Sequence, residues 1–454
     1  MNINRPVPLK MLKTVRHLAP AAALAGLLAA HSVAAQTPVT AALATETFDT
    51  AWTVIARTHW DSTYNGVDWN GLRAELRPRA EAARSNEALR AVLVDMLGRL
   101  HQSHFGIIPG DVQETLSGGE APSGQGDAGL DARLVDGRFL VTRVLPGGAA
   151  EAAGVKTGWG IDAVAGHPTA DILAALARLP ADTDPRVRSL HGWSALTRYF
   201  RGDAGDSVAV RFLDAADRPV DATLVLRPAT GVVTRFGNLP AMIVRVETER
   251  APLPDGRTVG ILRFNYWMPV VARQIDEAVD RLRDTDGLVI DLRGNLGGVG
   301  GMAAGVAGHF VERRDTLATM RMRGQSLYFV ADPRRVDTRS QPVQPYSRPV
   351  AVLTDAETAS TSEFFAGGLQ KLGRARVFGE TSAGQALPAI ARRLPNGDVM
   401  MHAIADFTGP TGERFEGAGV VPDQPAPPTR AALLAGHDPA LDAAKAWIAS
   451  QPRN

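Results

Sequence analysis

The sequence predicts an α/β core that is preceded by a helical unit and interrupted by a small β-rich domain. Two observations support this prediction. From residue 258 onward, short apolar runs typical of buried strands alternate with stretches in which apolar residues recur every three or four positions, as they do on helices. Between residues 42 and 99 only the helical spacing occurs. We therefore expect the principal sheet in the second half of the chain.

Composition narrows the classes of protein to which the chain can belong. Its 454 residues are 45% hydrophobic and 21% charged, which is typical of a soluble globular protein with two or three domains. The 49 Lys and Arg residues nearly balance the 48 Asp and Glu residues, so no overall charge favours nucleic acid or an anionic membrane as a partner. Partners should be recognised at local sites.

The first 35 residues predict a secretory signal peptide. An apolar segment, residues 18–30, follows four basic residues and precedes Val33-Ala34-Ala35, a small-residue cleavage site. A membrane anchor is the alternative, but it needs about 20 apolar residues. The chain contains no cysteine, hence neither a lipid-attachment cysteine nor a disulfide framework. We expect a periplasmic or secreted bacterial protein with no membrane insertion after cleavage.

A helical unit follows, and it ends at a histidine. Phe48, Trp52 and Ile55 mark one helix, and apolar residues between 89 and 100 mark a second. His104 lies on the loop after the second helix, just before the strand-like Ile107-Ile108. A histidine at such a position can be a structural hydrogen-bonding residue or a general base, and the sequence alone leaves both interpretations open.

Residues 127–228 have a β-rich pattern with an added helical segment. After a Gly-, Ser- and Pro-rich linker over 112–127, two strand patterns lead into a turn, residues 145–155, that contains P-G-x-A-x-x-A-A-G-V. This order of elements resembles a PDZ domain. Gly129, Leu130 and Asp131 fall where such domains bind the terminal carboxylate of a peptide and add the peptide as a strand. A generic β-rich spacer is the alternative.

A glycine-rich turn in the α/β region suggests exposed backbone donors. The predicted strand over 287–292 runs directly into Asn295-Leu296-Gly297-Gly298, which precedes a helical pattern. Such glycines can cradle a phosphate, but neither a complete Rossmann spacing nor a Walker lysine is present. The alternative use of the N–H groups of Gly297 and Gly298 is an oxyanion hole.

Ser360 stands at a predicted strand–turn–helix junction. Apolar residues 351–353 predict a buried strand, and the spacing from Phe364 onward predicts a helix. A serine there projects from a rigid scaffold, and the N–H of Thr361 in the first helical turn has no intrahelical acceptor. Helix capping by Ser360, Thr361 or Ser362 is the ordinary alternative.

A carboxylate further along the chain completes the candidate set. Glu416 follows Phe415 and precedes a glycine turn, which suggests partial burial. The alternative is an acid on a surface turn. The sequence has no H-E-x-x-H helix and no cysteine ligands, so we expect neither a metal nor a cofactor.

In order, the motifs D-L-R-G-N-x-G-G, T-A-S-T-S-E, G-E-T-S-A-G and E-G-A-G-V-V-P-D make the chain similar to the tail-specific, or C-terminal processing, serine peptidases. The resemblance implies a crotonase-like (ClpP-like) ββα core, with Ser360 as nucleophile and peptides or proteins as substrates, bound possibly through their C-termini. Together with the patterns above, it predicts the division into a signal peptide (1–35), a helical domain (40–110), a PDZ-like domain (127–228), a catalytic core (232–430) and a C-terminal helix (431–454).

One departure from that family selects a branch of it. Many members use a lysine 25 residues after the serine, but here this residue is Gln385, which cannot act as a base and is expected to form a wall of the site. The tricorn-core-like branch instead uses a histidine and a glutamate in segments that resemble those of His104 and Glu416. We expect Glu416 to orient His104 directly or through Ser103, and to raise the pKa of His104 above about 6.5. A relative that binds peptides without cleaving them is the alternative.

Overall fold

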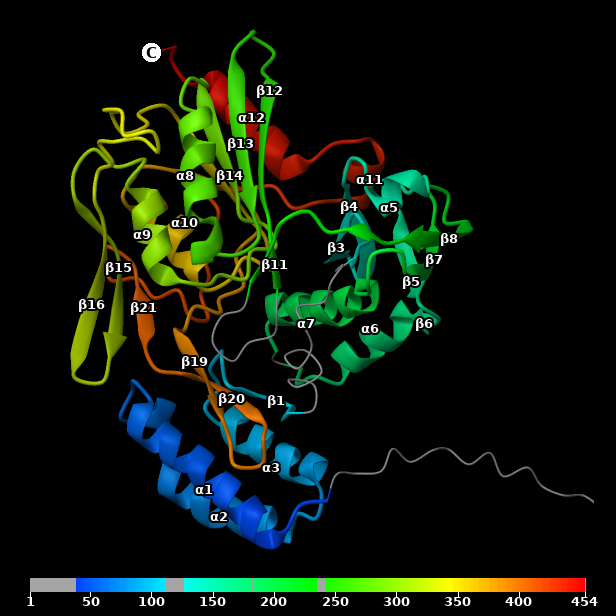
Figure 1. Cartoon of the computed structure of the whole chain (residues 1–454), viewed down its shortest axis with the longest axis vertical. Coiled ribbons are helices and arrows are strands. Elements are labelled where there is room, and N and C mark those ends of the chain that lie inside the picture. The colour runs from blue at the N-terminus through cyan, green and yellow to red at the C-terminus, as the bar shows by residue number, and fades with distance from the viewer. Residues whose placement is uncertain (1–37, 111–125, 182, 235–241, 454) are drawn as a thin grey trace, which may run out of the picture.

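The computed structural model describes residues 38–110, 126–181, 183–234 and 242–453. The predicted signal peptide and most of the predicted linker lie outside the described residues. Within the described ranges, no helix combines the length and apolar character needed to cross a membrane. Figure 1 shows the helical unit below the principal sheet and the β-rich domain beside that sheet.

Three helices form the N-terminal unit: α1 (Ala41–Thr58), α2 (Trp69–Ala82) and α3 (Asn86–Gly98), with the 3₁₀ helix η1 (Tyr64–Gly66) between the first two. Thr40, Asp68 and Ser85 cap the three helices with side-chain oxygens, as such residues do at N-termini. Leu394 and Met400 from a distant hairpin enter the apolar core of this unit. The unit is therefore packed onto the rest of the chain rather than tethered to it.

That hairpin consists of β19 (Ala389–Arg393) and β20 (Val399–Ala403), and its turn contains Pro395-Asn396-Gly397-Asp398, a sequence that favours a turn. Strand β1 (Gly106–Ile108), directly after His104, pairs antiparallel with β20. The sequence on either side of His104 is thus bound to two different parts of the molecule.

Residues 126–228, called the inserted domain from here on, have an apolar core of their own. Strand β2 (Gly126–Asp127), predicted as linker, pairs with β9 (Arg227–Pro228), so the chain enters and leaves the domain side by side. Its strands are β3 (Leu130–Val135), β4 (Arg138–Val144), β5 (Gly160–Val164), β6 (His167–Pro168), β7 (Ser207–Leu213) and β8 (Pro219–Val225). Its helices are α5 (Ala149–Ala152), α6 (Thr169–Ala177), α7 (Pro185–Thr197) and η2 (Arg198–Phe200).

The principal sheet has six strands in the order β12-β13-β14-β17-β18-β22, all parallel except β12. Their bounds are β12 (Val246–Pro252), β13 (Thr258–Phe264), β14 (Gly287–Asp291), β17 (Val350–Thr354), β18 (Arg376–Gly379) and β22 (Gln424–Pro425). Both faces of the central strands are apolar, because helices cover both.

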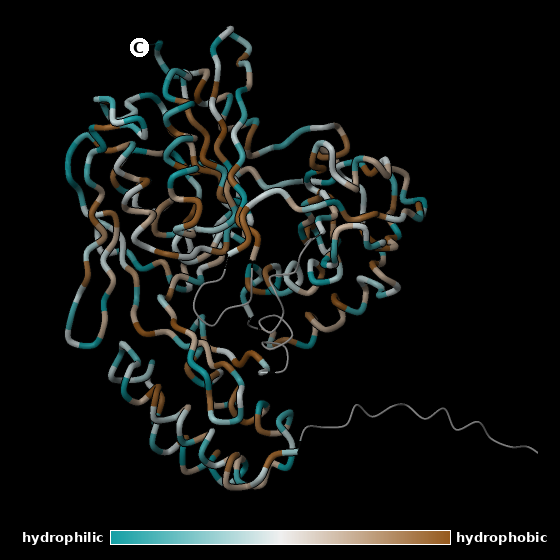
Figure 2. Tube along the Cα trace, in the orientation of Figure 1, coloured by the Kyte–Doolittle hydropathy of each residue, from teal (hydrophilic) through white to brown (hydrophobic). Residues whose placement is uncertain are grey.

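Alternate residues of these strands face two separate cores. Helices α8 (Ala272–Arg281), α9 (Gly300–Ala307) and α10 (Thr361–Lys371) cover the face that contains Ile290 and Val352. Helix α12 (Pro439–Ser450) covers the face that contains Val289 and Leu353. Figure 1 shows α12 behind the sheet, and Figure 2 shows hydrophobic residues gathered along its strands.

The remaining elements border this core. A hairpin of β15 (Asp315–Met322) and β16 (Gln325–Ala331) pairs with β21 (Asp406–Thr408), and β10 (Val232–Thr234) pairs with β11 (Met242–Val244). The short helix η3 (Pro269–Val271) precedes α8. The C-terminal segment, expected to hold one helix, also contains α11 (Arg430–Leu434), whose Leu433 packs against the inserted domain.

Candidate active site

Ser360 is the N-cap residue of α10 and follows the turn after the carboxyl end of β17. Its backbone has φ 57° and ψ −121°, a conformation that costs a non-glycine residue about 1–3 kcal/mol. The Ser360 N–H donates to the carbonyl of Gln385 at 2.9 Å and to Glu363 Oε2 at 2.9 Å. The strand–turn–helix prediction is confirmed, and Ser360 occupies the capping position as well.

The buried carboxylate of Glu363 holds this turn. Besides Ser360 it accepts hydrogen bonds from Ser382 Oγ (2.7 Å), Gly384 N (2.7 Å) and Gln385 N (3.0 Å). Burial raises the pKa of Glu363 to about 7, against the effect of these donors. In the sequence, the spacing of three from Ser360 indicates Glu363 only as a partner in helix capping and does not reveal this role.

His104, Ser103 and Glu416 form a continuous hydrogen-bonded chain. Ser103 Oγ lies 2.8 Å from His104 Nδ1 and donates to Glu416 Oε2 at 2.9 Å. The Ser103 N–H donates to Glu416 Oε1 at 2.8 Å, and Ala386 N donates to Oε2 at 2.9 Å. Of the two arrangements expected for Glu416, the structure has the one in which Ser103 stands between the carboxylate and the imidazole.

The side chains of Ser360 and His104 are linked only indirectly among the described residues. The Ser360 N–H binds the carbonyl of Gln385, and the next residue, Ala386, binds Glu416. No hydrogen bond between Ser360 Oγ and His104 is among those formed by the described residues. Catalytic hydrogen bonds often tighten only when substrate binds, so this arrangement leaves His104 a candidate base.

Burial shifts the pKa values of both His104 and Glu416. It lowers the pKa of His104 from 6.5 to about 4, because the protonated ring would lose hydration. Burial also raises the pKa of Glu416, against the hydrogen bonds from Ser103 and Ala386. The expectation that Glu416 raises the pKa of His104 is wrong for the free protein, because desolvation of the ring outweighs a carboxylate that acts through an intervening hydroxyl.

Two unpartnered amides lie beside Ser360. Trp267 donates to Gly297 O at 2.9 Å and accepts from Val299 N at 2.7 Å, which leaves the N–H of Gly298 between them without an acceptor in the described structure. The N–H of Thr361 likewise has none there. In contrast, Gly297 N donates to Asn295 Oδ1 at 3.0 Å. Of the expected donors, Gly298 and Thr361 are free and Gly297 is not.

Gly297 contributes space rather than a donor. A Cβ at this position would lie 2.7 Å from the Cβ of Ser360 and 3.0 Å from Thr361 N. Gly298 has φ 142°, and a Cβ there would lie 2.4 Å from the carbonyl oxygen of Trp267. Only glycine allows the two turns to approach this closely.

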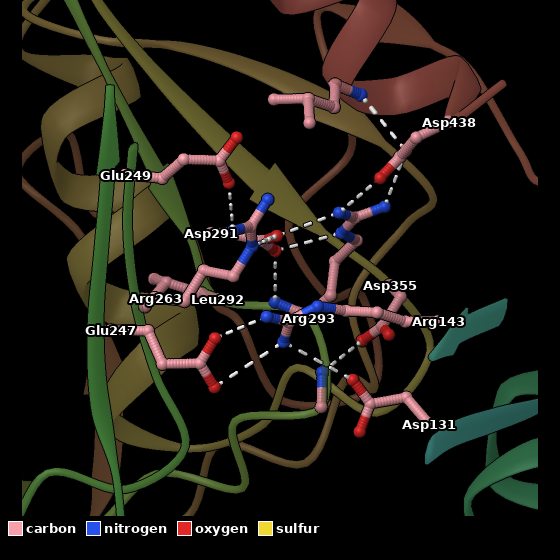
Figure 3. Close-up of polar contacts among 12 residues, drawn as sticks. Asp131, Arg143, Glu247, Glu249, Arg263, Asp291, Leu292, Arg293, Asp355 and Asp438 are labelled. Atoms are coloured by element: carbon pink, nitrogen blue, oxygen red, sulfur yellow. Dashed lines mark hydrogen bonds and ion pairs between the residues drawn. The ribbon is translucent and has the colours of Figure 1, made fainter. Parts of the chain in front are cut away.

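Ion pairs brace the strand that leads into the glycine turn. Arg293 binds both Asp291 and Asp438, the capping residue of α12, and Arg263 binds Asp291 at 3.0 Å (Figure 3). These contacts hold the pKa of Asp291 far below its usual value despite burial. Gly294 N donates to Asp355 Oδ1 at 2.9 Å, so the turn is also bound to the segment before Ser360.

Two of the three residues expected to bind a peptide terminus line a cavity of about 700 Å³ between the inserted domain and the core, and Gly129 is not among its lining residues. Leu130 and Asp131 are on its wall together with Trp193 of α7. The N–H of Gly129 is already bound to Asp127 Oδ1 at 2.8 Å. Ser360, His104 and Glu416 are not among the described residues that line this cavity.

Comparison with known proteins identifies the domain that carries Ser360. Residues 258–426 match the model of peptidase family S41. The chain contains an S41 peptidase domain. Residues 41–98 of this S41 peptidase match the C1 domain of tricorn protease, which covers α1 to α3. Expectations of a serine-type peptidase and of the C-terminal processing family are thereby confirmed.

Relatives of this S41 peptidase carry consistent names. A carboxyl-terminal-processing protease of Picosynechococcus sp. is 25% identical, with 83% of this chain and 82% of the relative covered. A chloroplastic C-terminal processing peptidase of Tetradesmus obliquus is 28% identical, with 82% and 75% covered.

Solved structures show the same fold. The photosystem II D1 C-terminal processing protease has a TM-score of 0.56 at 21% identity, over 90% of this chain and 99% of that one. Mature CPAF complexed with lactacystin has a TM-score of 0.59 at 15% identity, over 90% and 98%.

Proposed function

We propose that this S41 peptidase is an exported endopeptidase that cleaves protein or peptide chains near their C-termini with Ser360 as nucleophile. The observation that carries the proposal is the chain Glu416–Ser103–His104. It gives the histidine a fixed partner on Nδ1 and leaves Nε2 to act as a base. Export rests on the signal-peptide pattern of residues 1–35.

In the first step, His104 takes the hydroxyl proton of Ser360 while Ser360 Oγ attacks the peptide carbonyl. The Nδ1–H of His104 donates a hydrogen bond to Ser103 Oγ, and the hydroxyl of Ser103 donates a hydrogen bond to Glu416. The charge of Glu416 thereby stabilises the imidazolium. His104 then returns the proton to the leaving amine, and a water molecule repeats the sequence to release the acyl group.

The oxyanion of the tetrahedral intermediate would bind to the N–H groups of Gly298 and Thr361. Both amides lack a protein acceptor in the described structure, and they flank the residue that attacks. Removal of one such donor in comparable enzymes costs about 3 kcal/mol. The strained turn at Ser360 is part of this arrangement, because it presents Oγ beside the start of α10.

Substrate selection follows from the inserted domain. We assign it as PDZ-like and the core as crotonase-like, with a C-terminal tail entering the 700 Å³ cavity near Leu130 and Asp131. Names of the relatives describe C-terminal processing, which supports a substrate bound by its tail. Because the Gly129 N–H is occupied, the carboxylate would need other donors on this wall.

Hydrolysis of a peptide library tests the proposal. Wild-type protein should cleave peptides with free C-termini, and Ser360→Ala should abolish cleavage without loss of fold. Ser362→Ala is the matched control, because the Ser362 hydroxyl accepts from Trp267 Nε1 at 2.9 Å and has a packing role. Cleavage by Ser360→Ala at the wild-type rate would refute the assignment.

The alternative, a relative that binds peptides without turnover, gains no support from the comparisons. Binding of a peptide in the cavity with no cleavage by the wild-type protein would favour it.

A further inference from the structure

Arg186 reaches out of the inserted domain to the turn that carries Glu416. It lies in the first turn of α7, and its guanidinium donates to the carbonyls of Gly417 (2.7 Å), Ala418 (2.9 Å) and Ser382 (2.9 Å). Gly417 and Ala418 directly follow Glu416 in the chain. One side chain thus joins two loops of the catalytic core to a helix of another domain.

The Arg186 guanidinium fits closely against two glycines of the catalytic core. A Cβ at Gly419 would lie 2.5 Å from its Nη1, and a Cβ at Gly384 would lie 3.3 Å from it. Asp184 accepts from Arg186 Nε at 3.0 Å and from its backbone N–H at 2.8 Å, which fixes the direction of the side chain. The side chain is 20% exposed. A planar guanidinium has enough separated N–H donors to bind three carbonyls, whereas the compact ammonium of a lysine would not reach all three.

Both loops that Arg186 contacts, one with Ser382 and the other with Gly417 and Ala418, belong to the proposed catalytic site. The turn after Glu416 is also bound through Gly417 N to Gly384 O at 2.8 Å. Ser382, whose carbonyl Arg186 binds, donates its hydroxyl to Glu363. Arg186 therefore braces Glu416 on one side and the hydrogen bonds that hold Ser360 on the other.

We propose that Arg186 is a positioning residue, through which the inserted domain completes the active site. It touches no reacting atom and acts by holding Glu416 in register with Ser103. This inference rests on the proposed Ser360–His104–Ser103–Glu416 mechanism. A displacement of about 1 Å in such an array can lower a rate about 100-fold.

Arg188 provides a matched control on the same helix. Its guanidinium also binds backbone carbonyls, including those of Leu176 (2.6 Å) and Thr183 (3.3 Å), but these contacts stay within the inserted domain. Arg186→Ala should lower kcat about 10- to 100-fold with little change in KM. Arg188→Ala should leave kcat close to that of the wild-type enzyme, and melting temperatures would establish that both variants are folded.

A double-mutant cycle with Glu416→Gln separates positioning from general destabilisation. If Arg186 acts through Glu416, Arg186→Ala should add less than about twofold to the loss already caused by Glu416→Gln. The rate of Ser360 acylation by a fluorophosphonate probe serves as the readout when peptide turnover is too slow.

Equal kcat values for Arg186→Ala and Arg188→Ala would overturn the inference, as would a full multiplicative loss in the Glu416→Gln background. In either case the proposed function survives if wild-type hydrolysis still depends on Ser360. Failure of the wild-type protein to show Ser360-dependent hydrolysis would instead refute the proposed function itself.

Discussion

The turn that carries Ser360 and the loop that carries His104 are built in opposite ways. Ser360 stands on the principal sheet, and its turn is held by Glu363, three residues away in sequence. His104 stands on a loop between the helical unit and β1, and its support comes from Glu416, 313 positions from Ser103. The nucleophile is therefore positioned largely by its own segment, and the base by distant parts of the chain.

This difference determines how substitutions around the Ser360 turn and around the His104 loop should affect the protein. Changes at Glu363 should damage the nucleophile turn together with the fold around it, because four donors converge on one buried carboxylate. Changes at Glu416 or beneath the His104 loop should lower the rate while the fold persists.

The largest effect is expected for Glu363→Gln. An amide would place a donor against two of the four N–H and O–H donors that surround the carboxylate, at a cost of about 2–4 kcal/mol for buried groups left unpaired. Peptide hydrolysis should fall more than about 100-fold, and the melting temperature should fall with it. Normal hydrolysis in this variant would show that Glu363 does not hold the turn.

Glu416→Gln should be the next most harmful change. The carboxylate accepts two hydrogen bonds from Ser103 and one from Ala386, and an amide cannot accept all three. We expect kcat to fall about 10- to 100-fold with the fold retained. Glu413→Gln is the control, because Glu413 lies in the same region but binds Thr411. A loss in Glu413→Gln that equals the loss in Glu416→Gln would reassign the acid.

His59 supports the His104 loop from the helical unit. Its Nε2 lies 3.0 Å from Gln102 Oε1, and its ring stacks on Phe105 with 5.8 Å between centroids. His59→Ala should lower kcat about 3- to 10-fold through loss of this anchor. His59→Gln, which can still donate to Gln102, should recover most of the rate. Loss without such recovery would indicate a packing role alone.

The sequence predicts the local support of Ser360 better than the distant support of His104. The strand, the turn and the helix around Ser360 leave a local signal in apolar spacing and in the Ser-x-x-Glu cap. Nothing near His104 indicates Glu416 as a partner, because the contacts between Ser103 and Glu416 cross 313 positions of the sequence. The resemblance to a family supplied Glu416. The lowered pKa of His104 was missed, since burial of a loop residue depends on the assembled fold.

The pH dependence of kcat/KM reports on the protonation of His104. His104 must be neutral to accept a proton, and burial lowers its pKa to about 4. In the free enzyme kcat/KM should therefore show an ascending limb at about pH 4 from His104, and Glu363, whose pKa is about 7, should add a second limb near neutral pH. Absence of the limb at about pH 4 would mean that the ring is hydrated or that Glu416 stabilises its charge directly.

The smallest effect is expected when lysine is restored at the position used by other family members. Gln385→Lys in a His104→Ala background should recover no activity, because an active lysine must be desolvated enough to be neutral. The Gln385 side chain is partly exposed, which keeps a lysine there charged. Substantial recovery would identify a serine–lysine site.

The most direct test of the account is whether acylation of Ser360 depends on His104. A fluorophosphonate probe and peptide mapping should find label on Ser360 in the wild-type enzyme, and His104→Ala should slow labelling by about 100-fold or more while the melting temperature stays the same. Labelling of Ser360 at the wild-type rate in His104→Ala would show that His104 is not the base, and label on Ser362 instead would show that Ser360 is not the nucleophile.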